Sequence, residues 1–233
     1  MKKMYLYPVW LRIWHWINAF LFLFLIATGI SMYYADESDF LISFDNARLM
    51  HNITGITASV CFILYVIFNI KSKNYKHYIP KLQGITERMI KQGRFYVYGI
   101  FKGEDHPYHI SEKEKFNPLQ QITYFSVMFV MFPIVIISGW FLFFPELAPA
   151  EILGMGGVWP MVVLHIVFGF ILSVFMFGHI YLATHGETML SNFKSMFTGY
   201  HEVHGEHDAN VADEDNKKEE IEREDEAEYG SYI

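Results

Sequence analysis

Residues 158–184 read VWPMVVLHIVFGFILSVFMFGHIYLAT, an apolar run that contains two histidines. The run can cross a bilayer as one helix, since a hydrocarbon core about 30 Å thick takes about 20 helical residues. His165 and His179 are fourteen positions apart. At 3.6 residues per turn, that spacing returns nearly to the same helix face after a rise of about 21 Å. One face therefore carries two imidazoles, one toward each membrane surface, and ionisable side chains inside a membrane indicate a functional site.

Three further runs have the same character, at residues 11–34, 49–70 and 119–144. Hydrophobic residues make up 52% of the 233 residues and are concentrated in the four runs. The sequence therefore predicts an all-α fold, an integral membrane four-helix bundle. Residues 205–233 are rich in Glu, Asp and Lys, so we expect a disordered acidic tail there. This leaves residues 1–204 as the membrane domain.

Lysine and arginine are unevenly distributed among the connections. The 71–118 connection contains ten of them and the N-terminus contains Lys2, Lys3 and Arg12, whereas the 36–46 and 145–157 connections contain none. Cytoplasmic segments carry the excess of Lys and Arg. We therefore expect the 71–118 loop and both termini to be cytoplasmic. Within this loop, Pro80 is the expected start of a short amphipathic helix.

The cysteine content limits the possible cofactors. The single cysteine, Cys61, lies within an apolar run, which excludes disulfides, cysteine-ligated clusters and covalently attached c-type haem. A metal centre would need histidine or oxygen ligands. The net charge of −7 owes much to the acidic tail, and nothing in it points to a nucleic-acid partner.

Four intramembrane histidines fall at two depths. His15 and His179 are expected near the cytoplasmic side, which we call the inner level, and His51 and His165 near the opposite side, the outer level. A porphyrin iron has two axial positions, so each level offers the ligands of one bis-histidine haem. The predicted pairs are His51 with His165 and His15 with His179. Inward-facing side chains of helix bundles commonly build such cofactor sites.

Each outer histidine is followed four residues later by a glycine, Gly55 after His51 and Gly169 after His165. Residues i and i+4 share a helix face, so each glycine would leave room for a flat macrocycle. Glycine in membrane helices also permits close helix–helix contact, and a lone membrane histidine can be structural or part of a proton path. Two pairs at matched depths favour haem.

With these features the chain resembles a family of bacterial respiratory di-haem cytochrome b subunits. The family includes the gamma subunit of formate dehydrogenase and the cytochromes b of nickel–iron hydrogenase and thiosulfate reductase. The resemblance covers approximately residues 8–204 and rests on a few motifs: Arg12 with His15-Trp16, Thr28-Gly29, His51 with Gly55, the run from Lys115 to Gln121, and His165 with Gly169 and His179-Ile180-Tyr181.

The resemblance implies a subunit with two b haems in the bacterial inner membrane, embedded among membrane lipid. Such a subunit passes electrons between the quinone pool and a periplasmic redox partner of iron–sulfur, multihaem, hydrogenase or molybdoenzyme type. The partner, not this chain, would transform the terminal substrate. Both directions of electron flow are compatible with this arrangement.

The resemblance also implies a quinone, with menaquinone expected, on the cytoplasmic side. Asn117 and His179 would contribute to its site, although Asn117 could equally be a helix N-cap. Gln120, in the run that enters the third helix, is a further candidate cofactor-binding residue. The formate dehydrogenase subunit that the chain resembles has a glycine two residues after this asparagine, where this chain has Leu119. Candidates to neutralise haem propionates are Arg12, Arg48 and His106.

Two other functions are compatible with the same histidines. One is a stand-alone di-haem oxidoreductase that exchanges electrons between quinone and a small molecule, and the other is a proton or metal transporter. Proton relays commonly place Asp or Glu at helix centres. The four runs contain neither residue, which disfavours the transporter.

Overall fold

The computed structural model describes residues 2–34, 41–104, 107–108, 115–185 and 188–203. The chain forms two compact units. The bundle unit comprises Val9–Asn74 and Phe125–Ala183, and the loop unit comprises Met1–Pro8, Tyr75–Tyr124 and Thr184–Ile233. The predicted disordered tail and His106 lie outside the described residues.

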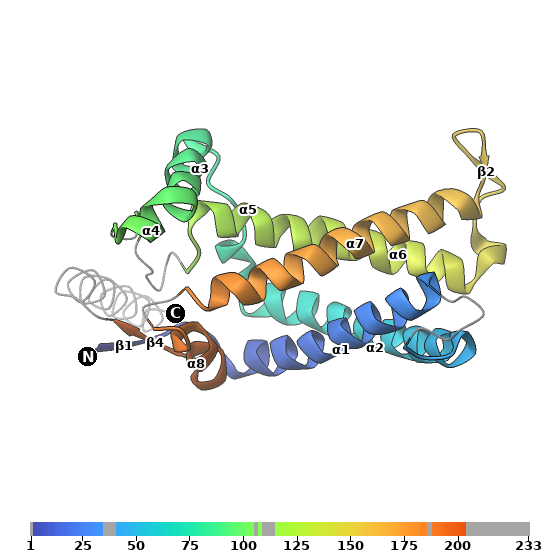
Figure 1. Cartoon of the computed structure of the whole chain (residues 1–233), viewed down its shortest axis with the longest axis horizontal. Coiled ribbons are helices and arrows are strands. Elements are labelled where there is room, and N and C mark those ends of the chain that lie inside the picture. Colours follow the sequence, from blue (N-terminus) through green and yellow to red (C-terminus); the bar gives the residue numbers. More distant parts are fainter. Residues whose placement is uncertain (1, 35–40, 105–106, 109–114, 186–187, 204–233) are drawn as a thin grey trace, which may run out of the picture. The chain divides into compact units, whose positions relative to one another are not determined.

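Four helical spans in the described part of the chain are long and apolar enough to cross a membrane (Figure 1). They are α1 (Val9–Tyr33), α2 (Phe44–Lys71), a third span over Pro118–Phe143, and α7 (Val158–Ala183). The predicted all-α membrane fold is therefore confirmed. Helix α2 begins before its apolar run because its polar first turn contains Asp45, whose carboxylate suits the positive end of the helix dipole.

The third span is not a uniform α-helix. It consists of α5 (Pro118–Ser126), a π-helical turn η3 (Val127–Met131) and α6 (Phe132–Phe143). Pro133, at the start of α6, has no backbone N–H to donate to the carbonyl four residues earlier. A wider turn directly before a proline accommodates that missing bond.

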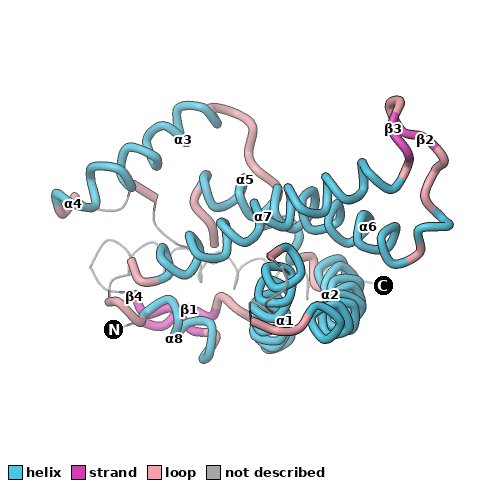
Figure 2. The backbone as a smooth tube through the Cα atoms, turned by 45° about the vertical axis from the view of Figure 1, so that its right-hand side comes forward, coloured by secondary structure: helices cyan, strands magenta, loops and turns pink. Residues whose placement is uncertain are grey.

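The bundle unit is built from two helical hairpins, α1 with α2 and α6 with α7. The connection from α6 to α7 contains η4 (Pro145–Leu147) and a small hairpin of β2 (Glu151–Ile152) and β3 (Met155–Gly156), visible in Figure 2. Tryptophan N–H groups tie the helices together. Trp14 donates to the Cys61 carbonyl at 3.0 Å and Trp140 donates to the Ser59 hydroxyl at 3.2 Å. These bonds satisfy indole donors that the apolar surroundings would otherwise leave unpaired.

The core of the bundle unit is an apolar cluster. Ala58, Val127, Phe132 and Leu172 are buried together, and the Phe22 and Phe62 rings each lie 5.2 Å from the Phe132 ring. Leu172 is midway along α7 between the two histidines of that helix. Packed hydrocarbon therefore separates the two histidine levels.

The loop unit contains mostly short elements. Strand β1 (Lys2–Tyr5) pairs antiparallel with β4 (Tyr200–Val203). Helix α8 (Ser191–Thr198) ends at Gly199, whose φ of 88° is in the left-handed region that glycine tolerates. The remaining elements are η1 (Asn74–His77), which begins at the last residue of the bundle unit, α3 (Ile85–Arg94), the π-helical turn η2 (Phe95–Gly99) and α4 (Ile100–Lys102).

The predicted helix start at Pro80 is wrong. Helix α3 begins at Ile85, because Gly84 adopts a left-handed φ of 62° and interrupts the chain before it. Ile90 on this helix is largely exposed, and basic side chains, including Lys91 and Arg94, lie along the same element. The helix is therefore amphipathic, as its sequence pattern indicates.

Candidate functional site

The histidines of the bundle unit lie in two pairs, each joining the α1–α2 hairpin to the α6–α7 hairpin. The ring centres of His51 and His165 are 6.1 Å apart, with an angle of 71° between the ring planes. Those of His15 and His179 are 6.2 Å apart, with an angle of 60°. These are the two pairings that the spacing of the histidines predicts.

The separation within each pair suits two axial ligands of one metal. A bond from imidazole nitrogen to a metal is about 2 Å long, so two imidazoles on opposite sides of one ion have ring centres about 6 Å apart. Among the described residues, no group of three or more His, Cys, Asp or Glu side chains gathers at one point. Each pair thus offers two ligands, and a macrocycle-bound iron has two axial positions to fill.

The hydrogen bonds of His51 assign its tautomer. The Thr28 hydroxyl lies 2.9 Å from His51 Nδ1 and donates its own proton to the Phe24 carbonyl at 2.6 Å. Because that proton is committed, the hydroxyl accepts from Nδ1–H. Nε2 of His51 then carries the lone pair that a metal requires.

His165 is held in the same way on the other hairpin. Its Nδ1 lies 3.0 Å from the Val135 carbonyl, which can only accept, and 3.2 Å from the Ser138 hydroxyl. Ser138 donates its proton to the Ile134 carbonyl at 2.7 Å. Nδ1 of His165 is therefore the donor, and Nε2 again keeps its lone pair.

Glycines surround the outer pair. A Cβ added at Gly169 would meet no atom within 4 Å, and one at Gly55 would meet only Leu25 Cδ2 at 4.0 Å. This open space beside the ligands is what a flat cofactor needs. Gly29 and Gly139 lie against the histidine rings themselves, because their added Cβ atoms would be 3.6 Å from His51 Cε1 and 3.0 Å from His165 Cε1.

Sequence reasoning did not identify Thr28, Ser138 and Gly139 as parts of this site. An internal repeat could have revealed them. A hydroxyl-glycine dipeptide, Thr28-Gly29 or Ser138-Gly139, faces each outer histidine, and each outer histidine is followed by glycine at i+4 and serine at i+8. Those serines, Ser59 and Ser173, both donate to the carbonyl of the preceding glycine at 2.8 Å.

Asn117 and Gln120 form a reciprocal helix cap at the start of α5. The Gln120 N–H donates to Asn117 Oδ1 at 2.9 Å, and the Asn117 N–H donates to Gln120 Oε1 at 3.1 Å. Asn117 Nδ2 donates to the Tyr96 hydroxyl at 3.0 Å. Burial raises the pKa of Tyr96 despite this opposing hydrogen bond, so the phenol keeps its proton at neutral pH.

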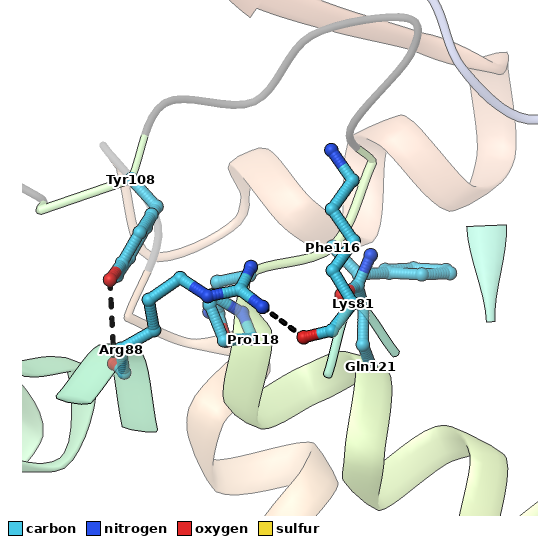
Figure 3. A pocket seen from close by; sticks show the side chains of 7 residues that line it. Lys81, Arg88, Tyr108, Phe116, Pro118 and Gln121 are labelled. Carbon is cyan, nitrogen blue, oxygen red and sulfur yellow. Dashed lines mark hydrogen bonds between the residues drawn. The ribbon is translucent and has the colours of Figure 1, made fainter. Parts of the chain in front are cut away.

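A pocket of about 140 Å³ adjoins this cap within the loop unit (Figure 3). The Arg88 guanidinium donates to the Lys81 carbonyl, and the Tyr108 hydroxyl donates to the Arg88 carbonyl at 3.5 Å. The lining combines the basic Lys81 and Arg88 with the apolar Phe116 and Pro118. It comprises Lys81, Arg88, Tyr108, Phe116, Asn117, Pro118 and Gln121.

The other candidate residues are spread over both units. Arg12 lies on α1, three residues before His15. Arg48, on α2, forms an exposed ion pair with Asp45 at 3.5 Å. Asn117 and Gln120 belong to the loop unit and His179 to the bundle unit.

The chain is similar to a known protein family and to two known proteins. A family model described as prokaryotic cytochrome b561 matches residues 6–199. A putative cytochrome, YdhU, of Escherichia coli K12 is 36% identical over 205 residues, which cover 86% of this chain and 75% of that protein. A probable Ni/Fe-hydrogenase B-type cytochrome subunit of Rhodobacter capsulatus is 25% identical over 164 residues, covering 67% of this chain and 58% of that protein.

Replacing the ring-contacting glycines by alanine should affect the two outer histidines unequally. In Gly139→Ala the new Cβ would stand 3.0 Å from His165 and displace the ring, whereas in Gly29→Ala the 3.6 Å contact with His51 is ordinary. We expect Gly139→Ala to weaken retention of the outer cofactor about tenfold, a typical effect of residues that support a ligand. Gly29→Ala should stay near wild type. Cofactor content per purified chain measures both, and equal loss in the two variants would contradict the geometry.

The two roles of Asn117 can be separated by substitution. Asn117→Ala loses the cap and the hydrogen bond to Tyr96, each of which is worth about 1 kcal/mol. Asn117→Ser keeps a capping hydroxyl and loses only the bond to Tyr96, as Tyr96→Phe also does. Thermal unfolding in detergent should rank Asn117→Ala below the other two variants, which should be similar. Equal destabilisation by Ala and Ser would show that the cap contributes nothing.

Proposed function

The chain belongs to the prokaryotic cytochrome b561 family, and from this premise we propose that it is the di-haem membrane subunit of a respiratory oxidoreductase. It is a multi-pass membrane b-type cytochrome that acts in electron transfer. In the proposed role it transfers electrons between a periplasmic partner and the quinone pool. The substrate of the whole complex would be transformed by the partner.

The single observation that carries this proposal is the presence of two imidazole pairs of nearly equal separation, 6.1 and 6.2 Å. His51 and His165 would hold one haem b through Nε2, and His15 and His179 would hold the other. When bound, each haem supplies a one-electron redox centre. Gly55 and Gly169, where an added Cβ would meet little or nothing within 4 Å, would leave room for the outer macrocycle.

The side chains around the pairs would have distinct tasks. Thr28 and Ser138 would fix the orientation of the outer ligands, since both face a histidine Nδ1. The Arg12 guanidinium, close to His15 in sequence, would neutralise a propionate carboxylate. The apolar layer around Phe132 and Leu172 would exclude water between the two levels.

We propose a periplasmic redox subunit as the partner. The Rhodobacter relative is named as a hydrogenase cytochrome subunit, which supports assembly with a redox enzyme. An iron–sulfur, multihaem, hydrogenase or molybdoenzyme subunit would each supply a one-electron donor or acceptor. The bacterial inner membrane is the proposed location, and the Lys and Arg of the 71–118 connection support cytoplasmic termini.

A quinone, expected to be menaquinone, is the proposed substrate on the cytoplasmic side. By the family resemblance Asn117 would contribute to its site, and Gln120, which shares the helix cap with Asn117, is a further candidate. The Asn117 amide has two N–H donors; one is bonded to Tyr96, and the other would donate to a quinone carbonyl. Tyr96 would contribute a protonated phenol beside it. Leu119, in place of the glycine of the formate dehydrogenase subunit, would narrow this site.

Substitution of the histidines tests the proposal directly. His51→Ala and His165→Ala should each lower the haem content from two to about one per chain, and both should remove the same redox component, because one iron loses an axial ligand. His15→Ala and His179→Ala should remove the other component. Haem content and redox-difference spectra of the purified variants measure this outcome.

His185→Ala is the matched control, since this histidine follows α7 and belongs to neither pair; its Nδ1 lies 3.1 Å from the Thr184 hydroxyl. It should keep both haems. If His51→Ala and His165→Ala removed different components, the pairing would be wrong. If none of the four substitutions removed haem, the proposed function would fail.

A further inference from the structure

The two outer histidines are held in the same way on different hairpins. We use the word socket for the hydroxyl that faces each Nδ1, together with its helix turn: Thr28 for His51 and Ser138 for His165. In each socket a hydroxyl gives its proton to the carbonyl one helical turn earlier, Thr28 to Phe24 at 2.6 Å and Ser138 to Ile134 at 2.7 Å. The lone pairs of both hydroxyls therefore face imidazole Nδ1–H groups. The same hydrogen-bond pattern thus occurs on both hairpins, although α1 and α6 differ in sequence around these positions.

At His165 a backbone carbonyl adds a second acceptor. His165 Nδ1 also lies 3.0 Å from the Val135 carbonyl, three residues before Ser138. Each outer imidazole thus donates Nδ1–H to a hydroxyl, and His165 donates to a carbonyl as well, so both tautomers are fixed by the protein itself.

The inner level is different. His15 Nδ1 is buried and has no hydrogen-bond partner among the described residues. The His15 ring meets the edge of Trp16 at 5.2 Å, and the His179 ring stacks on Phe175 at 5.8 Å. At least one inner ligand therefore lacks the acceptors that both outer ligands have.

This difference has a direct electronic consequence. An imidazole that donates its Nδ1–H to an acceptor is a more basic ligand, and a more basic ligand stabilises the oxidised form of the metal. Hydrogen bonding of the axial ligands is one of the means by which proteins set haem potentials. Acceptors on both ligands should therefore lower the midpoint potential.

We propose that Thr28 and Ser138 are positioning residues that hold the midpoint potential of the outer haem below that of the inner haem. This rests on the proposed two-haem function. The difference favours electron flow from the outer to the inner level: one electron leaves the outer haem, which is oxidised, and enters the inner haem, which is reduced. The geometry thus favours delivery of electrons from the periplasmic partner to quinone.

The test is a potentiometric titration of the purified full chain with Thr28→Val and with Ser138→Ala. Each substitution removes a hydroxyl acceptor, and Ser138→Ala leaves the Val135 carbonyl bonded to His165. We expect the midpoint of the outer haem to rise in each variant and to rise further in the double variant, while the midpoint of the inner haem stays unchanged. His51→Ala, which keeps only the inner haem, assigns the two midpoints.

Three controls separate this effect from a general loosening of the helices. Thr28→Ser and Ser138→Thr keep the hydroxyl and should keep the wild-type midpoint. Ser31→Ala removes another fully buried hydroxyl of α1, which donates to the Ala27 carbonyl at 2.9 Å in the same i to i−4 form. It should leave both midpoints unchanged.

The outcomes are distinguishable from failure of the proposed function. Two haems with unchanged midpoints in Thr28→Val and Ser138→Ala would overturn the inference and leave the function intact, as would a wild-type outer haem of higher potential than the inner one. A wild-type chain without two haems would instead overturn the function. If Thr28→Val lost the outer haem, Ser138→Ala decides, because the Val135 carbonyl still holds His165 in place.

Discussion

An imidazole within the hydrocarbon layer must find partners for its nitrogen atoms, and this requirement organises the bundle. Leaving a polar group unpaired in such surroundings costs several kcal/mol. The outer histidines meet the requirement at Nδ1 through Thr28 and Ser138, which lie on the neighbouring helix of each hairpin. Nε2 of each outer histidine keeps the lone pair that a metal requires.

The arrangement of the helices follows from that constraint. Gly29 and Gly139 allow the histidine rings to lie against the adjacent helix, and Gly139 is the tighter of the two contacts. Each hairpin thus presents one outer ligand from a nearly identical socket. The inner pair, His15 and His179, comes from α1 and α7, so the resemblance between the hairpins does not extend to this level. One fold therefore provides two sites of similar spacing and different hydrogen bonding.

The spans and the histidine pairs could be predicted because hydropathy and the helical period act along single helices. The sockets could not, since a serine or threonine in a helix commonly bonds its own i−4 carbonyl. Whether the hydroxyl of Ser138 also reaches His165 depends on how two helices pack. The start of α3 was misplaced because Pro80 is a common helix start, while the left-handed conformation of Gly84 decides the boundary. Asn117 caps α5 and also contacts Tyr96, so capping and a contact with quinone do not exclude each other.

The central claim is that each imidazole pair holds one b haem. A pyridine-haemochrome assay on the purified full chain counts the haems and identifies their type. The account predicts two non-covalent haems b per chain, in keeping with two pairs of axial ligands. One haem or none in a folded, membrane-extracted protein would contradict it.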